Sequence, residues 1–258
     1  MSTYAIGDIQ GCYKELQNLL NHINFDQKKR SVKSIKLIII HYTGMQSERE
    51  SMKRLCDQKS KVSSHFVISR NGKIYRLVKE TNIAWHAGKS KWIKYKNLNK
   101  YSIGIELVNR GHKYGYTSFN KKQILNLIKL CKKLKLKYKI AKQNIVGHSD
   151  IAPLRKIDPG EKFPWKKLAM QKIGIWHKCR PNFLKKFRKV KVFKEKDKIK
   201  FIKNLNYIGY CVDIKKKSLF NKTLKAFQRH YRGDLISAIL DKECLLIAEN
   251  LAKNYKNY

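Results

Sequence analysis

Two short apolar runs that each end in a histidine limit the fold of this chain more than any other feature of its sequence. Residues 35–41 end at His41, and residues 145–148 end at His148. Continuous apolar runs of this kind are typical of strands that are buried on both faces of a sheet. We therefore expect two inner strands that each carry an imidazole to the start of a loop.

The elements predicted around these strands complete an α/β pattern. Residues 102–109 form a third strand-like run, with Glu106 inside it. Residues 63–78 predict a hairpin around Asn71-Gly72, because an Asn-Gly turn favours positive φ at both residues. Residues 121–136 place leucine and isoleucine at helical spacing, with lysines on the opposite side. The predicted fold is a central mixed β-sheet flanked by helices.

Four stretches of different character predict the domain organisation. Residues 1–27 are an appended N-terminal segment, residues 34–178 alternate strands with helices, and residues 179–195 are a basic linker. Residues 196–258 predict a small helical domain. Its three helix-like segments lie around residues 201–205, 222–231 and 237–253.

The charge of the chain is strongly positive. Lysine and arginine number 59 against 18 aspartate and glutamate residues, a formal net charge of +41. Such a charge favours polyanions: nucleic acid, acidic membranes or an anionic cell-wall polymer. The lysines are spread along the chain after residue 27, and an AT-rich genome explains such a spread equally well. We therefore expect nucleic-acid binding only as non-specific electrostatics.

Several features bear on the compartment. No apolar run approaches the roughly 20 residues that a membrane-spanning helix needs, so we expect no transmembrane segment. Residues 1–8 lack the basic and apolar regions of a secretory signal. The six cysteines are widely spaced without a CxxC pair, which predicts reduced thiols. The expected location is cytoplasmic rather than periplasmic or in the cell envelope.

Five polar residues at or near strand ends suggest a metal site. His41, His148 and Asp158 would supply three nitrogen or oxygen ligands, as in catalytic zinc sites that leave the fourth position to water. Zinc lowers the pKa of that water to roughly 7. Glu106 would then act as general base, and Lys156 would stabilise an oxyanion on the substrate.

Each of these residues also has a structural interpretation. A single histidine at a strand end is more often a satisfied structural residue than a metal ligand. Glu106 alone fits half of a buried ion pair. Asp158 stands before Pro159-Gly160 and fits the opening of a turn. Spacing alone leaves these alternatives open.

Several motifs in this chain resemble a known enzyme family. Residues 148–160, His-Ser-Asp-Ile-Ala-Pro-Leu-Arg-Lys-Ile-Asp-Pro-Gly, resemble the zinc-site loop of bacterial N-acetylmuramoyl-L-alanine amidases, especially the subgroup with the anhydro-muropeptide recycling enzymes. The resemblance covers about residues 35–178. Further matching motifs, in the same order as in the family, are residues 40–43, 64–68, 84–90, 102–106 and 173–176.

The resemblance implies a role for each residue of the site. The family's zinc ligands fall on His41, His148 and Asp158, which implies one Zn²⁺ per chain. Its catalytic glutamate falls on Glu106 and its carbonyl-polarising lysine on Lys156. Aspartate as third ligand separates the chain from relatives with cysteine there.

Other positions bear on the substrate groove. Trp85, His86 and Asn109 are expected to line it, whereas His65 is interpreted as structural packing. Leu154 departs from the family, which usually has glycine there, and a bulky side chain would narrow the groove or shift the loop.

The implied reaction is hydrolysis of the amide between the lactyl group of N-acetylmuramic acid and L-alanine. The substrates would be peptidoglycan or anhydro-muropeptides, whose carboxylates suit a basic groove. The alternative is a non-catalytic protein that binds peptidoglycan or nucleic acid and keeps a relict zinc site. The complete set of five site residues argues against that alternative.

Both ends of the chain carry weaker resemblances. Residues 206–210 and 223–231 resemble a small three-helix peptidoglycan-binding domain, although they also fit a plain helical core. Residues 1–16 are similar to the start of symmetrical dinucleoside tetraphosphatases, with Asp8 and Gln10 at the first metal motif. The Gly-Asn-His motif of that family does not occur, so we interpret residues 1–27 as a truncated remnant without phosphatase activity.

Overall fold

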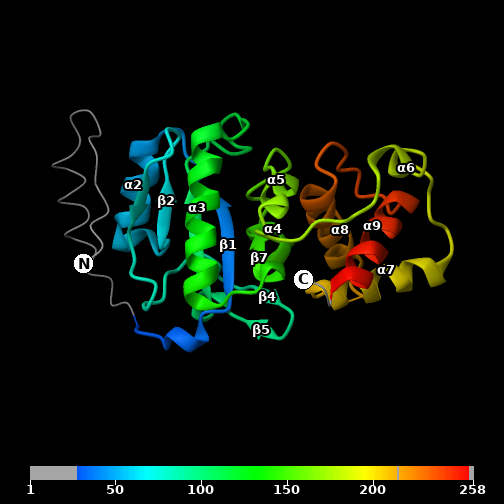
Figure 1. Ribbon diagram of the computed structural model, residues 1–258, viewed down its shortest axis with the longest axis horizontal. Coiled ribbons are helices and arrows are strands. Elements are labelled where there is room, and N and C mark those ends of the chain that lie inside the picture. Colours follow the sequence, from blue (N-terminus) through cyan, green and yellow to red (C-terminus); the bar gives the residue numbers. More distant parts are fainter. Residues whose placement is uncertain (1–27, 214, 256–258) are drawn as a thin grey trace.

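The computed structural model describes residues 28–213 and 215–255 (Figure 1). The metal motif predicted around Asp8 and Gln10 lies outside the described residues. Along the described chain, a sheet with its covering helices comes first and a group of helices follows it.

A five-stranded mixed sheet lies at the centre of the first part. Its strand order is β3-β2-β6-β1-β7, and β1 pairs in parallel with both β6 and β7. Strand β2 is parallel to β6, whereas β3 is antiparallel to β2. The mixed sheet predicted from the sequence is confirmed. The strands are β1 (Leu37–Tyr42), β2 (Phe66–Ile68), β3 (Ile74–Arg76), β6 (Ser102–Leu107) and β7 (Ile145–Gly147), with a separate pair β4 (Lys91–Trp92) and β5 (Tyr95–Lys96).

The hairpin predicted around Asn71-Gly72 is confirmed, but its turn differs from the prediction. Strands β2 and β3 end at Ile68 and Ile74, so five residues connect them instead of two. Gly72 has a φ of +94°, whereas Asn71 is not among the residues with positive φ. The Asn71 side chain instead accepts a hydrogen bond of 3.0 Å from the amide of Lys73, which holds the wider loop.

Helix α3 (Lys121–Tyr138) covers one face of the sheet and lies in front of it in Figure 1. Alternate residues of β1 point to opposite faces. Ile38 and Ile40 share a cluster with α3, whereas Leu37 and Ile39 belong to the cluster on the other face. The side chain of His41 follows Leu37 and Ile39 by this alternation, away from α3.

The second face of the sheet is covered by shorter elements. Helix α2 (Glu48–Cys56) packs near the hairpin, and its cap residue Ser47 accepts a hydrogen bond of 3.1 Å from the amide of Glu50. Helix α4 (His148–Ile151) follows β7 directly. Single-turn 3₁₀ helices connect these elements: η1 (Val32–Ser34), η2 (Gln58–Ser60), η3 (Leu98–Lys100) and η4 (Lys142–Asn144).

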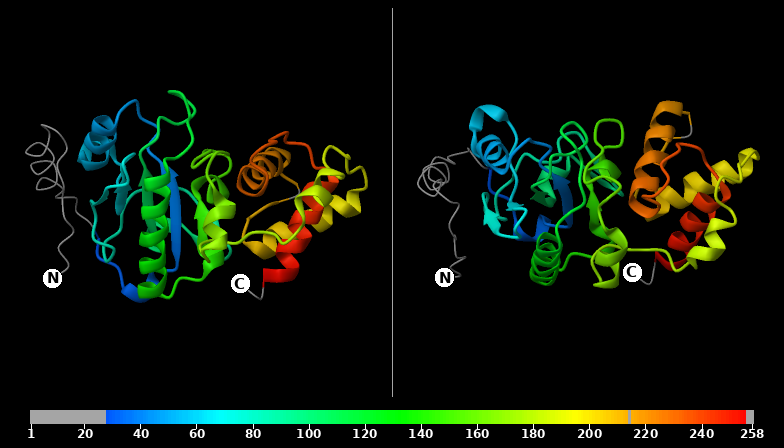
Figure 2. Two further views of the ribbon diagram at one scale, coloured as in Figure 1. Left: turned by 45° about the horizontal axis from the view of Figure 1, so that its top comes forward. Right: turned by 90° about the horizontal axis from the view of Figure 1, so that it is seen from above.

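The remaining helices lie beyond β7, at the opposite end of the molecule from α2 (Figure 2). The three predicted C-terminal helices are confirmed as α7 (Glu195–Ile208), α8 (Lys217–Tyr231) and α9 (Lys242–Asn254). The third begins later than the predicted residue 237, because Asp241 is its N-cap and accepts a hydrogen bond of 2.9 Å from the amide of Cys244. Helices α5 (Trp165–Met170) and α6 (Pro181–Lys185) precede them.

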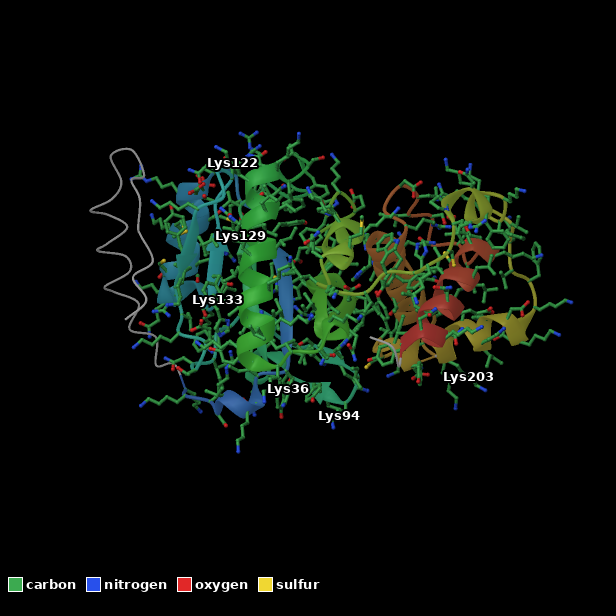
Figure 3. All side chains as sticks on the ribbon, viewed as in Figure 1. Lys36, Lys94, Lys122, Lys129, Lys133 and Lys203 are labelled. Atoms are coloured by element: carbon green, nitrogen blue, oxygen red, sulfur yellow. The ribbon has the colours of Figure 1, made fainter. Side chains whose placement is uncertain are left out.

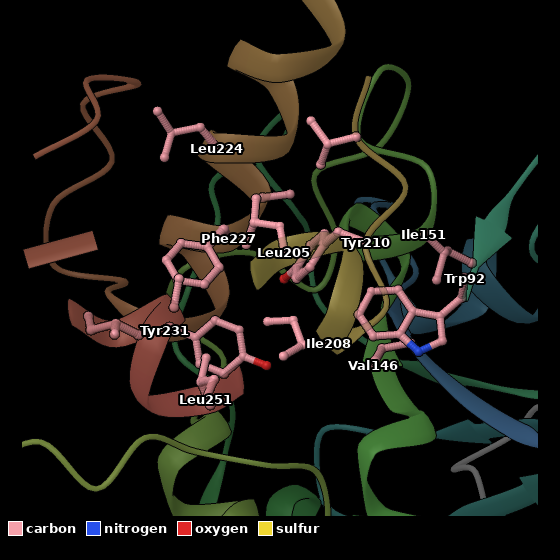
Figure 4. Packing of buried hydrophobic residues seen from close by; sticks show 14 of the residues in the cluster. Trp92, Val146, Ile151, Leu205, Ile208, Tyr210, Leu224, Phe227, Tyr231 and Leu251 are labelled. Atoms are coloured by element: carbon pink, nitrogen blue, oxygen red, sulfur yellow. The ribbon is translucent and has the colours of Figure 1, made fainter. Parts of the chain in front are cut away.

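One hydrophobic cluster runs through both the sheet and the C-terminal helices. It joins Leu37 and Ile39 of β1 to Phe201 of α7 and Phe227 of α8. Figure 4 shows helical residues of this cluster beside Trp92, Val146 and Ile151. The predicted linker, residues 179–195, also packs on α9, since the amide of Lys242 donates to the carbonyl of Val190 at 2.8 Å. The two parts therefore share a core.

Lysine side chains lie on the surface of both parts of the molecule. Figure 3 labels lysines along α3, below the sheet and on α7, in agreement with the spread seen in the sequence. Cysteines 56, 131, 179, 211 and 244 are free thiols. Among the described residues, none of the helices has the length and apolar character needed to cross a bilayer.

A glycine that touches the shared core gives the first prediction. Gly209 has a φ of +126°, and a Cβ there would overlap the ring of Trp92. Gly209→Ala should lower the free energy of unfolding by about 3 kcal/mol, through overpacking and backbone strain together. Gly115 has a φ of +90° with nothing within 4 Å of its missing Cβ, so Gly115→Ala is the matched control and should cost about 1 kcal/mol. Urea denaturation measures both losses of unfolding free energy. Equal losses in the two variants would show that overlap with Trp92 does not contribute to the effect of Gly209→Ala.

Candidate metal centre

Three buried ligand atoms converge at the carboxyl ends of β1 and β7. The Nδ1 atoms of His41 and His148 are 3.0 Å apart, and each lies 3.1 Å from Oδ2 of Asp158. His41 is 1%, His148 3% and Asp158 7% exposed. Three such atoms around one point fit the three protein ligands of a catalytic zinc site. The structure therefore brings together the three predicted ligands.

Local backbone bonds place the second and third of these residues. Strand β7 ends at Gly147, and His148 is the first residue of α4. The amide of Gly147 donates to Oδ2 of Asp150 at 2.8 Å, which closes the turn of α4. The amide of Ser149 donates to the carbonyl of Asp158 at 2.8 Å. The loop that returns to the site is thus tied to the helix that carries His148.

The outer nitrogen of His41 begins a chain of buried hydrogen bonds. With Nδ1 turned to the ligand cluster, Nε2 of His41 carries the proton and donates to Nδ1 of His86 at 3.0 Å. Nε2 of His86 then donates to the hydroxyl of Ser102 at 3.2 Å, and this hydroxyl donates to the carbonyl of Leu98 at 2.6 Å. The chain fixes the tautomer and the orientation of His41.

His148 has an equivalent partner on the neighbouring segment. Its Nε2 donates to the carbonyl of Ala87 at 3.2 Å. Arg155 donates to the same carbonyl at 2.9 Å and to the carbonyl of Lys89 at 2.7 Å. Both imidazoles therefore present Nδ1 to the cluster, and both use Nε2 as a donor to a fixed acceptor.

A glycine makes room for the ring behind His41. Gly104 lies opposite Ile39 in the register of β6 against β1, on the face that also carries His41. A Cβ at Gly104 would overlap the ring of His86. A side chain of any size at this position would therefore displace His86 from its bond to His41.

The electrostatics of the cluster hold His41 and Asp158 in the protonation states that metal ligands need. Burial, with His148 beside it, lowers the pKa of His41 to about 4, so the imidazole is neutral at pH 7. Burial alone would raise the pKa of Asp158, but the neighbouring His148 and His41 lower it well below its usual value. A neutral imidazole and an ionised carboxylate bind a metal without first losing a proton.

Glu106 lies beside the ligand cluster, and one of its carboxyl oxygens has no hydrogen-bond partner among the described residues. It is the register partner of His41 across the β1–β6 pair. Its Oε2 is buried and unpaired within the described residues. Burial and the charge of Asp158 raise the pKa of Glu106 to about 8, against an opposing effect of Lys156. A carboxyl group with a raised pKa next to a metal site is a candidate proton acceptor.

A cavity of about 430 Å³ opens over these residues. Glu106 and Lys156 line it together with the three ligand residues, and Trp85 lies on its wall, 41% exposed. His86 also reaches the wall, but it is only 8% exposed because its ring lies behind His41. Further lining residues are Arg54, Lys113, Tyr114 and Arg155, so the wall is rich in cations.

Two residues with expected roles at the groove lie away from the cavity. Asn109 is 3% exposed and is not among the lining residues; its amide donates to the carbonyl of Thr117 at 2.8 Å and accepts from Gly111 at 3.1 Å. Leu154 is 55% exposed and also absent from the cavity wall. Its φ is not positive, so the loop accepts a side chain here. The expected narrowing of the groove by Leu154 is wrong for this cavity.

Comparisons with known proteins agree with this geometry. The profile of the N-acetylmuramoyl-L-alanine amidase family matches residues 31–161. The amidase AmiD of Escherichia coli is 38% identical over 245 residues, which cover 89% of this chain and 86% of AmiD. The chain belongs to the N-acetylmuramoyl-L-alanine amidase family. This family in general depends on zinc, and the His-His-Asp cluster supplies a fitting donor set.

Other relatives of this amidase support the same assignment. The 1,6-anhydro-N-acetylmuramyl-L-alanine amidase AmpD of Haemophilus influenzae is 34% identical over 56% of the chain and 85% of its own length. A structure of E. coli AmiD with anhydro-N-acetylmuramic acid-L-Ala-D-gamma-Glu-L-Lys superposes with a TM-score of 0.77, at 35% identity, over 90% of this chain and 93% of that one. The structure of AmpDh3 of Pseudomonas aeruginosa in complex with anhydromuramic pentapeptide superposes with a TM-score of 0.76, at 28% identity. The match covers 99% of this chain and 98% of that one.

Several residues that shape the amidase site were not singled out in the sequence. Ser102, Gly104 and Arg155 hold His86 or the carbonyl behind His148, and Asp150 closes the helix of His148. One signal was available for Gly104, because an isolated glycine inside a strand pattern indicates close approach by a neighbour. Nothing in the local sequence indicates the partners of the other three.

The buried carboxyl group of Glu106 makes the stability of the metal-free amidase depend on pH. Its pKa rises from 4.5 to about 8 on folding, so the folded protein keeps this proton where the unfolded chain has lost it. Stability should therefore fall as pH rises from about 4.5 to about 8. Glu106→Gln removes this loss, and at pH 9 the metal-free variant should be more stable by at most about 5 kcal/mol.

Denaturant unfolding of metal-free protein between pH 5 and pH 9 measures this effect. Glu195→Gln is the control, since the side chain of Glu195 is 64% exposed, and it should not change the pH dependence. A difference between wild type and Glu106→Gln that stays constant over this range would contradict the assignment.

Proposed function

We propose that this amidase hydrolyses the amide between the N-acetylmuramoyl lactyl group and L-alanine, using one Zn²⁺ held by His41, His148 and Asp158. The proposed substrates are peptidoglycan fragments, with anhydro-muropeptides first among them. The observation that carries the proposal is the meeting of three ligand atoms within 3.1 Å of one another beside the unpaired carboxyl oxygen of Glu106. The substrates named for the AmiD and AmpDh3 complexes support the substrate class.

The donor set fits zinc better than a hard cation. Two imidazoles and one carboxylate match zinc's preference for nitrogen and oxygen ligands, whereas Ca²⁺ and Mg²⁺ favour oxygen alone. Bound zinc supplies Lewis acidity, which lowers the pKa of water and polarises an amide carbonyl. The fixed tautomers of His41 and His148 orient Nδ1 toward it.

Glu106 and Lys156 have complementary roles in the proposed reaction. Glu106, on the cavity wall beside the ligand residues, takes the proton of the attacking water and returns it to the leaving amine of L-alanine. Lys156 is half-buried on the cavity wall, where its ammonium group stabilises the oxyanion that forms on the carbonyl.

Substrate contacts are proposed for the outer part of the cavity. Trp85 offers an indole face on the wall, suited to packing against a sugar or peptide. Arg54 and Lys113 add positive charge to the same wall, which favours the carboxylates of a stem peptide. His86 lies deeper, and we assign it to positioning His41 in addition to its place on the wall. Asn109 has an indirect role, because its side chain holds the loop that carries Lys113.

The alternative is a binding protein with a relict site, and Glu106 argues against it. A buried carboxyl oxygen without a partner among the described residues costs free energy, and a protein that only binds gains nothing by keeping it. The spread of lysines along the chain, with labelled examples in both parts of the molecule in Figure 3, also favours non-specific attraction to polyanions over a nucleic-acid site.

Release of stem peptide from a purified anhydro-muropeptide tests the proposed function. Wild type should release it only with zinc, and a chelator should stop the reaction. Glu106→Gln should lose at least about 100-fold in kcat, the usual contribution of a general base, while it keeps its zinc. Asp158→Ala should lose zinc and activity together. Full activity of Glu106→Gln would refute its role, and a wild type that binds zinc but releases nothing would favour the binding protein.

Gly104→Ala tests the positioning of His41 by His86. The added methyl group should push His86 away and weaken zinc binding by about 10- to 100-fold, the range seen when a partner behind a metal ligand is lost. Competition with a chromophoric chelator measures the zinc dissociation constant. Gly115→Ala is again the control and should bind zinc as wild type does. Wild-type affinity in Gly104→Ala would remove His86 from this role.

A further inference from the structure

A buried carboxylate that takes no part in the ligand cluster lies close to it. Asp150 is the third residue of α4, two positions after His148, and is 2% exposed. Its Oδ2 accepts from the amide of Gly147 at 2.8 Å, within the same turn. A buried carboxylate needs more than one donor to offset its lost hydration.

The other donors come from the C-terminal helices. The hydroxyl of Tyr210, just after α7, donates to Oδ1 of Asp150 at 2.6 Å. Nδ1 of His230, near the end of α8, donates to Oδ2 at 2.8 Å. Burial and the charge of Asp150 raise the pKa of Tyr210 well above 10, so its hydroxyl keeps the proton that it donates. These donors lie 60 and 80 residues away from Asp150 in the sequence.

Ring packing fixes both donors. His230 is stacked on Trp165 at 4.0 Å and on Tyr231 at 4.1 Å between ring centroids. Tyr210 meets Trp92 edge to face at 5.0 Å. Figure 4 shows Tyr210 between helical residues of the shared core and the residues Trp92 and Ile151. These contacts hold the planes of both rings beside Asp150.

We propose that Tyr210 and His230 are positioning residues for the metal ligand His148, and that they act through Asp150. The C-terminal helices thereby complete the scaffold of the active site, whatever else they bind. The inference rests on the proposed zinc site, because His148 is a ligand only if that site holds zinc. Without the two donors, the carboxylate keeps one bond from Gly147, and the turn that carries His148 loses its hydrogen bonds to the C-terminal helices.

Point variants of the full chain test this role. Tyr210→Phe removes only the hydroxyl, and His230→Phe keeps a ring for stacking while it removes the donor. Each should raise the zinc dissociation constant by about 10-fold or more, the effect expected for partners behind a ligand. The loss of activity should be restored by added zinc, because the ligands themselves are intact.

Leu224→Ala is the matched control for damage to the helical core. Leu224 lies in α8, is fully buried in the shared cluster and makes no bond to Asp150. This variant should lower Tm at least as much as Tyr210→Phe, but it should leave the zinc dissociation constant unchanged. An Asp150→Asn background provides a second readout: without the carboxylate charge, Tyr210→Phe should weaken zinc binding less than it does in wild type.

The outcomes separate this inference from the proposed function. A wild type that binds no zinc removes both. A wild type that binds zinc, beside Tyr210→Phe and His230→Phe proteins with unchanged dissociation constants, overturns the inference alone. The inference is also overturned if Leu224→Ala weakens zinc binding as much as the two donor variants do.

Discussion

The parallel pairing of β1 with β6 is the constraint on which the site depends. Its register sets His41 beside Glu106, Ile39 beside Gly104 and Leu37 beside Ser102. Side chains alternate along a strand, so these residues share one face, while the alternate residues pack against α3. If β6 slipped by one residue against β1, Glu106 would no longer lie on the same face as His41. The space that Gly104 leaves for His86 would also move to the face that packs against α3. The apolar residues under α3 therefore fix the chemistry on the opposite face.

On that face, the two imidazoles of the candidate metal centre are paired in an ordered way. Each ligand imidazole turns one nitrogen inward and bonds the other to a fixed acceptor, His86 or the carbonyl of Ala87. Asp158 keeps its charge because two histidines face it. One oxygen of Glu106 has no hydrogen-bond partner among the described residues, and burial raises the pKa of this carboxyl group to about 8. The site thus tolerates one unfavourable group at the position where a proton acceptor is needed.

The C-terminal helices belong to the same structure as the sheet. They share its hydrophobic cluster, and Gly209 lets the chain pass directly against Trp92. Through Tyr210 and His230 they also reach the turn that carries His148. A division at the basic linker describes the order of elements along the chain, but the core and the hydrogen bonds cross it. Tyr210 and His230 lie far from Asp150 in the sequence. They bond to its buried carboxylate only because tertiary packing brings these segments together.

The sequence by itself predicted the main strands of the sheet, the long helix and the three residues that meet at the candidate metal centre. Apolar runs that end in His41 and His148 are most favourably placed as inner strands of a sheet. Asp158 follows His148 closely in the sequence, so one short segment of chain carries both residues. Tertiary structure decided what surrounds them: Asn109 turns into its own loop, and His86 bonds to His41. Residues far apart in sequence make these contacts, and their partners depend on how elements pack. The local sequence pattern indicates whether a segment is a strand or a helix. It does not indicate which side chain of another element will pack or bond against it.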